Sequence, residues 1–447
     1  MVDSKTCPVP RVSVVTLTAL VIANMVGTGV FTSLGFQLMS LNSGFVLLLL
    51  WFVGGCCAFC GALCYAELGA ALARSGGEYH FLTRIYGRSI GFLAGWVSAT
   101  TGFAAPVALA AMALGSYVNR VFPGLNATGV GLSVIALVTL LHLLRPAVGT
   151  AFQNGFTLLK VVLILVVIAL AVLHGAPSPM SFAPRPGDMA LVAGPGFAIS
   201  LVFVMYAYSG WNASTYVASE AVNPARDIPR SLLVGTAAVM ALYLGLNWAF
   251  LRTTPAAELT GRTEVGLIAI GHMVGPRLAR FLGGAIALLL VSTISSMVRV
   301  GPRVTKTMGE DYPILGFLAR TNADGAPWAA ILFQSGLSVV LVLSGSFERV
   351  LVYAQFLLLL CTLLAAFGVI LLRLREPALP RPYHTWGYPV TPVVFLATTL
   401  WMMAWVVKDK PRESLLGLTT ATVGMVLFTL SHKKTGPAAG APVSEVE

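Results

Sequence analysis

Two short clusters of glycine, hydroxyl and amide residues interrupt otherwise apolar stretches of the sequence. The first is GTG at residues 27–29, and the second is SGWN at residues 209–212. Glycine costs about 1 kcal/mol relative to alanine inside a helix, and polar groups among apolar residues need partners. A helix is therefore predicted to open at each cluster. The alternative is that these glycines only let helices pack closely, but their clustering with polar groups favours an opening.

An opened helix exposes backbone groups with a definite chemistry. The half that begins near Gly29 presents amide N–H groups with about half a positive charge, which suits a carboxylate. The half that ends near Val26 presents carbonyl groups, which suit an ammonium. The ligand that fits both halves is a zwitterion. The apolar stretches around both clusters contain no Asp, Glu, Lys or Arg, so a zwitterion with a neutral side chain is favoured.

The elements that carry these clusters are predicted to be membrane helices. Only 10% of the 447 residues are charged and the mean hydropathy is +0.85, so the apolar surplus must face a lipid bilayer. The chain is therefore predicted to be an all-α polytopic membrane protein. Twelve windows are long and apolar enough to span a bilayer: 12–37, 45–72, 89–118, 128–144, 152–173, 190–219, 231–251, 281–302, 328–344, 350–372, 389–407 and 414–431.

Charge indicates how these windows are oriented. With the N-terminus inside the cell, 17 lysines and arginines face the cytoplasm and 10 face the other side, so both termini are predicted to be cytoplasmic. The formal net charge of +11 does not indicate a nucleic-acid partner, because no basic run is longer than Lys433 and Lys434. We expect a multi-pass protein of the plasma membrane, the inner membrane in a bacterium, with a cytoplasmic N-terminal segment, 1–11, and a disordered tail, 432–447.

The two interruptions fall in the first and the sixth window. Interruptions in corresponding positions are typical of transporters built from two inverted repeats, with a binding site at mid-membrane. The sequence therefore predicts a first five-helix repeat at 12–174, a second at 190–372, and two additional helices at 389–431. Helices 1 and 6 are predicted to be unwound at mid-membrane.

Four motifs, in order along the chain, resemble one family. They are GTGVF at 27–31, YAELGAALARSGGEY at 65–79, YAYSGWN at 206–212 and LRLREPALPRP at 372–382. With these motifs the chain resembles the amino acid–polyamine–organocation superfamily, and within it the bacterial relatives of the L-type amino acid transporter light chains. The resemblance implies a LeuT-type fold and sodium-independent transport of neutral L-amino acids by alternating access.

The resemblance also implies nine substrate-binding residues. The GTG turn would bind the substrate carboxylate, and backbone carbonyls from both breaks would bind the amino group. Tyr206 would cap the substrate as a gate, and Ser209 stands where the light chains commonly carry Gly, which favours alanine, serine or threonine. The nine are Met25, Gly27, Thr28, Gly29, Tyr206, Ala207, Ser209, Trp211 and Asn212.

Lys160 lies inside the fifth window, where burying a lysine costs at least about 2.5 kcal/mol. The resemblance implies that its ammonium replaces a sodium ion between the first and eighth helices, near the hydroxyls of Ser292, Ser295 and Ser296. It also implies that Tyr243 helps the opened first helix to close. A permanently protonated Lys160 would be a strut in an exchanger, whereas a Lys160 that releases its proton could drive a proton symporter. Exchange is preferred, and both remain open.

Other classes of protein lack support in the sequence. Cys56, Cys60 and Cys64 share a helix face, but no His or acid lies within one turn on it, so neither a metal nor a cofactor is expected. The loop at 119–127 has no cysteine, so no disulfide-linked heavy chain is expected. No HExxH or serine-nucleophile motif indicates an enzyme, and no ring of charges indicates a channel.

Seven charged residues lie near cytoplasmic helix ends, where a network of ion pairs could hold an inner gate shut. Since surface ion pairs contribute little, we interpret them as scaffold. They are Glu67, Arg74, Glu78, Glu220, Arg226, Arg230 and Arg303.

Overall fold

The computed structural model describes residues 11–144, 150–176, 178, 180–322 and 325–434. Within these ranges the chain is helical, and the only β-structure described there is an isolated bridge between Val12 and Ala221. The predicted N-terminal segment and tail fall almost wholly outside the described residues.

Ten helical segments of the described chain are long and apolar enough to cross a membrane. This confirms the prediction of an all-α polytopic class. The ten are α1 (Val14–Met25) with α2 (Gly29–Gln37), α3 (Gly44–Ala71), α5 (Arg88–Val97) through the π-helical turn η1 (Ser98–Gly102) into α6 (Ala104–Val121), α7 (Ala127–Leu144), α8 (Thr150–Leu173), α11 (Pro224–Thr253), α13 (Val265–Asp311), α15 (Phe347–Arg375), α16 (Val390–Asp409) and α17 (Pro411–Lys434).

The remaining elements are shorter. The helices α10 (Pro195–Tyr208) and α14 (Trp328–Ser344) occupy the other two predicted windows with 14 and 17 residues. The others are α4 (Gly77–Tyr86), α9 (Asp188–Ala193), the 3-10 helix η2 (Ala213–Glu220), α12 (Ala256–Leu259) and the 3-10 helix η3 (Pro313–Ala319). By length, therefore, ten segments of the described chain suffice to cross a membrane, and α10 and α14 are shorter.

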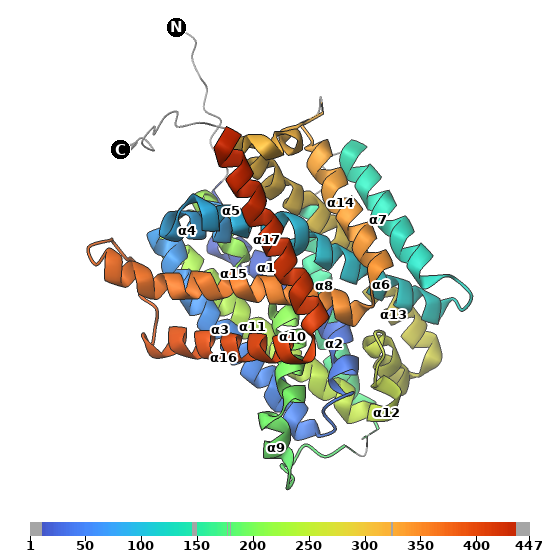
Figure 1. The fold of residues 1–447 in the computed structure, drawn as a ribbon. Coiled ribbons are helices and arrows are strands. Elements are labelled where there is room, and N and C mark those ends of the chain that lie inside the picture. The colour runs from blue at the N-terminus through green and yellow to red at the C-terminus, as the bar shows by residue number, and fades with distance from the viewer. Residues whose placement is uncertain (1–10, 145–149, 177, 179, 323–324, 435–447) are drawn as a thin grey trace.

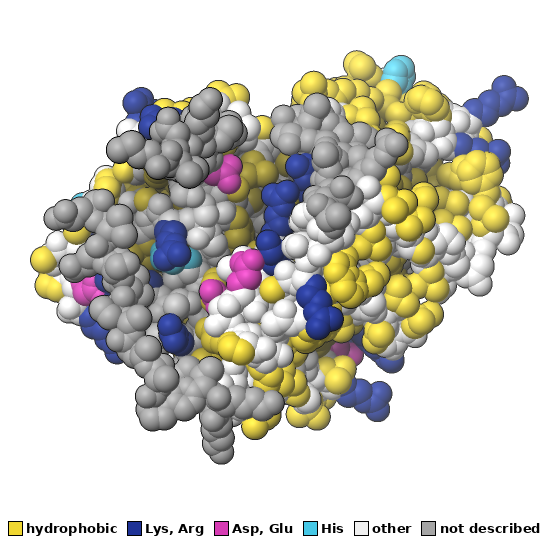
Figure 2. Space-filling view, turned by 90° about the horizontal axis from the view of Figure 1, so that it is seen from above, with side chains coloured by type: hydrophobic (Ala, Val, Ile, Leu, Met, Phe, Trp, Pro, Cys, Tyr) yellow, Lys and Arg dark blue, Asp and Glu magenta, His cyan; other side chains and the backbone are white. Residues whose placement is uncertain are grey.

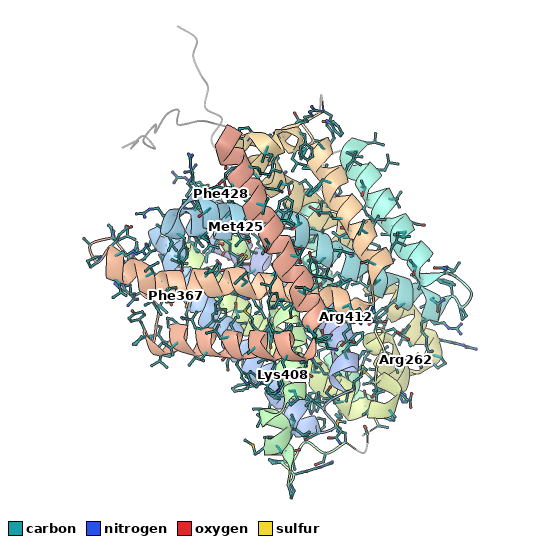
Figure 3. All side chains as sticks on the ribbon, viewed as in Figure 1. Arg262, Phe367, Lys408, Arg412, Met425 and Phe428 are labelled. Carbon is teal, nitrogen blue, oxygen red and sulfur yellow. The ribbon has the colours of Figure 1, made fainter. Side chains whose placement is uncertain are left out.

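The outer surface of the bundle is apolar, as a protein solvated by lipid requires. Leu137 and Leu140 on α7 are 66% and 53% exposed, and Phe367 projects outward from α15 in Figure 3. Lys408, at the end of α16, and Arg412, at the start of α17, lie near the turn that joins these helices (Figure 3). In the view of Figure 2, Lys and Arg side chains lie among broad areas of apolar surface.

The bundle has two ends, which we name after short helices that lie there (Figure 1). The α4 side carries α4, the end of α3, η2 and the start of α1. The α12 side carries α12, the end of α2 and the start of α3. The bridge between Val12 and Ala221 ties the start of α1 to the end of η2 on the α4 side.

Two helices are broken where the sequence predicts openings. The helix α1 ends at Met25 and α2 begins at Gly29, so three residues separate them. The helix α10 ends at Tyr208, and Gly210 follows with a φ of +95°, a conformation that suits glycine. A Cβ at Gly210 would lie 2.9 Å from the carbonyl carbon and oxygen of Asn24. The two breaks therefore face each other at backbone contact.

Candidate functional site

A cavity of about 250 Å³ lies between the two breaks. Its wall combines both breaks with side chains from η1, α6, α13 and α15. All nine predicted substrate-binding residues line it: Met25, Gly27, Thr28, Gly29, Tyr206, Ala207, Ser209, Trp211 and Asn212. Residues nearly 190 positions apart are thus brought to one cavity by the contact between the breaks.

The tyrosine hydroxyl of Tyr243 connects the two breaks. Its single proton is shared between the carbonyl oxygens of Met25, at 2.6 Å, and Ala207, at 3.1 Å. Ser209 Oγ donates to the carbonyl of Tyr206 at 2.7 Å. The carbonyls of Met25 and Ala207 each keep a second lone pair, so they can accept a further hydrogen bond from a bound ammonium, whereas the Tyr206 carbonyl also accepts from the N–H of Ser209 at 3.0 Å.

The start of α2 offers donors to the same cavity. Its N-cap residue, Thr28, is buried and makes no side-chain cap bond. The first N–H groups of a helix have no partner within the helix, and those of α2 begin at Gly29, which lines the cavity. Donors at this edge and carbonyls at the ends of α1 and α10 form the two poles that a zwitterion needs.

On the α12 side the cavity is closed by tight packing. A Cβ at Gly29 would lie 2.6 Å from the Cα of Ala207, so α2 and α10 touch backbone to backbone. Phe36 stacks on Phe203 and Phe347, with ring centroids 5.6 and 5.4 Å away. Farther out, the N–H of Gly261 donates to the carbonyl of Gly35 at 2.8 Å.

Lys160 is buried on α8, and its ammonium donates to Oγ1 of Thr293 at 3.1 Å. Thr293 belongs to α13 and lines the cavity. Lys160 therefore contacts the helix that the resemblance implies, through a hydroxyl that sequence reasoning did not name. The three serines named there, Ser292, Ser295 and Ser296, lie within one turn of Thr293, and Ser295 pairs with His142 Nε2 at 2.9 Å.

Glu78 is one of the residues in the cavity wall that sequence reasoning did not place there. Its side chain is only 5% exposed, and Oε1 accepts hydrogen bonds from Tyr65, at 2.7 Å, and from Asn212, at 2.9 Å. Burial raises the pKa of Glu78 to about 7, although both hydrogen bonds act in the opposite direction. The sequence feature that could have indicated a special position for Glu78 is the GGEY motif at 76–79. In the structure, Gly76 and Gly77 of this motif both have positive φ.

Glu78 takes no part in an ion pair among the described residues. Among the described residues, Glu67 is the member of the predicted set that forms an ion pair, with Arg373 at 2.6 Å and with Arg381 at 3.5 Å. Glu78 instead faces neutral partners inside the bundle. The difference arises because α4 lies against Tyr65 of α3, where Glu78 is buried. No cation among the described residues pairs with it there.

The comparison with known families decides the class of this protein. The model of the family described as amino acid permease matches residues 12–428. The chain belongs to this family of the amino acid–polyamine–organocation superfamily. The resemblance seen in the four sequence motifs is thereby confirmed, and the amino acid permease is a membrane transporter and not an enzyme.

Individual relatives of this permease are distant but nearly full-length. Asc-type amino acid transporter 1 of Mus musculus is 26% identical over 94% of this chain and 81% of its own length. Serine/threonine exchanger SteT of Bacillus subtilis (strain 168) is 26% identical over 86% and 88%. Large neutral amino acids transporter small subunit 2 of Homo sapiens is 24% identical over 94% and 80%.

The cysteines of the permease offer no ligand set for a metal. In the part of the chain that the structure describes, no three His, Cys, Asp or Glu side chains gather in a way that could hold an ion. Cys56, Cys60 and Cys64 are reduced, and Cys56 lies on the exposed surface of α3 while Cys64 is buried.

Proposed function

We propose that this permease is a sodium-independent exchanger of small neutral L-amino acids that works by alternating access. The observation that carries the proposal is the gathering of nine predicted binding residues around one cavity, where two broken helices supply both donors and carbonyls. Coordination by backbone groups suits the part of the substrate that all amino acids share.

In this proposal the two poles of the cavity bind the two ends of the amino acid. The amides at Gly29 and the hydroxyl of Thr28 bind the carboxylate. The carbonyls of Met25, Tyr206, Ala207 and Ser209 bind the ammonium, and Met25 shares its oxygen with the Tyr243 hydroxyl. Tyr206, which is buried beside the cavity, caps the substrate, and Trp211 and Asn212 complete the wall.

The size of the cavity supports small substrates. About 250 Å³ is below the range of about 300–1,000 Å³ typical of sites for drug-sized ligands. Ser209 adds a side chain where the light chains commonly carry Gly. The name of one relative, a serine/threonine exchanger, points the same way. Alanine, serine and threonine are therefore the proposed substrates.

For coupling, Lys160 serves in this proposal as a fixed ammonium that braces α8 against Thr293 on α13, which makes a sodium ion unnecessary. The name of one relative, a serine/threonine exchanger, favours exchange. The alternative is a proton-coupled symporter in which Lys160 carries the proton.

The proposed architecture is the LeuT-type fold with twelve spans. Repeats at 12–174 and 190–372 are related by inversion, and helices at 389–431 follow them. Both termini are proposed to be cytoplasmic, in the inner membrane of a bacterium, and no heavy chain linked by a disulfide is required. On this assignment the α4 side faces the cytoplasm and the cavity is closed to the outside.

Counterflow tests the proposal. Proteoliposomes are loaded with unlabelled L-serine, or left empty, at equal pH on both sides and without sodium, and uptake of labelled L-serine is followed. Uptake confined to loaded vesicles supports an exchanger. Uptake into empty vesicles that grows with an inward proton gradient supports the symporter instead. Equal uptake by loaded and empty vesicles without a gradient would overturn coupling by exchange, and no uptake of any neutral amino acid would overturn the function.

A further inference from the structure

The carboxyl of Glu78 is buried in the cavity wall without a cation beside it. A buried carboxylate is costly unless it is paired or hydrogen-bonded to its charged form. Two arginines on the α4 side form ion pairs with other carboxylates: Arg84 pairs with Glu376, and Arg373 pairs with Glu67. Among the described residues, no ion pair includes Glu78.

In the part of the chain that the structure describes, the titratable groups that face Glu78 are neutral near pH 7. These groups are Tyr65 on α3, Tyr216 on η2 and Cys361 on α15. On α4 itself, burial together with Arg74 and Arg84 lowers the pKa of His80, so this side chain is uncharged as well. The neighbouring helix α5 contributes no group that shifts the pKa of Glu78.

Glu78 also lies at the point where the α4 side of the cavity is held together. Its partner Asn212 directly precedes η2, so their bond joins α4 to the broken end of α10. Two further contacts tie the same segments. Ser75 and Ser219 share a hydroxyl hydrogen bond of 2.6 Å, and a Cβ at Gly77 would lie 2.7 Å from the ring of Tyr216.

We propose that Glu78 is a proton-binding site in the wall of the cavity, which keeps its proton while α4 and the segment after α10 are packed together and releases it when they separate. The proton leaves the carboxyl oxygen for water that enters between the two segments, and no other bond is made or broken. The inference rests on the proposed transport function, because opening of the α4 side is a step of alternating access.

The direction of the pH effect follows from the environment of the carboxyl. The pKa of Glu78 is raised above its ordinary value of about 4.3 to about 7. Its stabilising contribution to the packed arrangement is therefore complete below about pH 4, and it is lost as pH rises through 7. Alkaline pH should loosen the α4 side.

The test uses full-length protein and a substitution that keeps shape and hydrogen-bond acceptor but removes titration, Glu78→Gln. Thermal unfolding in detergent is measured from pH 5 to 8.5 for the wild type, for Glu78→Gln and for Glu310→Gln. Glu310 is an exposed carboxylate paired with Lys306 at 3.3 Å on the same side, so its variant is the matched control. The melting temperature of the wild type and of Glu310→Gln should fall as pH rises from 5 and level off above about pH 7, and that of Glu78→Gln should lack this component.

A second variant keeps the carboxyl and changes its environment. Tyr65→Phe removes one of the two donors that stabilise the charged form, so the pH at which the melting temperature levels off should rise. Parallel melting profiles for wild type, Glu78→Gln and Tyr65→Phe would overturn the proton site. Because melting needs no substrate, this failure is distinct from the absence of counterflow, which would overturn the transport function. The counterflow rate of Glu78→Gln should likewise lose its dependence on pH around 7.

Discussion

The two halves of the cavity are closed by different kinds of contact. On the α12 side, α2 and α10 meet backbone to backbone, and stacked rings of Phe36, Phe203 and Phe347 lie above them. On the α4 side, the Val12–Ala221 bridge joins the segment before α1 to the end of η2, Asn212 donates a hydrogen bond to Glu78, and Ser75 and Ser219 share another.

The difference indicates which half is easier to open. Close packing of apolar groups resists even the addition of one methyl group, whereas a few hydrogen bonds exchange readily with water because each contributes only about 1 kcal/mol net. A cavity with one rigid half and one polar half can open reversibly at the polar end. In the described structure, the rigid half on the α12 side is closed.

The largest effect is expected where the rigid half meets the cavity. Gly29→Val would place its Cβ 2.6 Å from the Cα of Ala207, and backbone cannot move aside cheaply. Overpacking costs about 3 kcal/mol or more when neighbours cannot relax, so counterflow of L-serine should fall by about 100-fold or more. Gly336→Ala is the control, since nothing lies within 4 Å of its Cβ position and it does not line the cavity. Near-normal affinity in Gly29→Val would refute the site.

Gly35 tests closure at the outer end of the same half. A Cβ there would overlap the carbonyl oxygen of Arg262 and lie 2.8 Å from that of Leu259. These oxygens belong to a connecting segment that can shift, so Gly35→Ala should reduce counterflow by about tenfold, equivalent to about 1.4 kcal/mol. Gly284→Ala should have no effect, because nothing lies within 4 Å of its Cβ position. An equal effect of both substitutions would contradict tight closure.

Lys160 tests whether the scaffold behind the two halves is part of the transport machinery. Lys160→Ala removes the ammonium from Thr293 and leaves space in the bundle, and we expect transport to fall by roughly tenfold, about 1.4 kcal/mol. Thr293→Val removes the same hydrogen bond but keeps the ammonium, so it should be milder. Wild-type rates with an unchanged pH profile in Lys160→Ala would remove the residue from the coupling mechanism.

The smallest effect is expected at the tyrosine that connects both breaks. Tyr243→Phe leaves the carbonyls of Met25 and Ala207 without this donor, which costs about 1 kcal/mol. Affinity for L-serine should weaken by about fivefold, and the melting temperature should fall slightly. Tyr353→Phe is a suitable control, since its hydroxyl contacts Thr101 and Thr420 away from the breaks. Unchanged affinity would mean that Tyr243 only packs.

Local features of the sequence determined much of the architecture. Hydropathy over about 20 residues predicts membrane helices because a bilayer imposes that length. Glycine with polar neighbours predicts a break because both disfavour a buried helix at that position. Met25–Gly29 and Tyr206–Asn212 could thus be placed at a site from the chain alone, although ten segments and not twelve are long enough to span.

Long-range contacts decided what those local features could not. Glu78 lies in a connection between apolar windows that contains several charged residues, which predicts an exposed position. Only the packing of α4 against α3 and η2 removes Glu78 from water and from cations. Similarly, only the tertiary structure shows that Lys160 donates a hydrogen bond to Thr293 on α13 and that the Tyr243 hydroxyl contacts both breaks. The sequence by itself determined the helices and where two of them break, because those depend on neighbouring residues. The tertiary structure alone decided which side chains meet between them, because burial and charge pairing depend on residues far away in the chain.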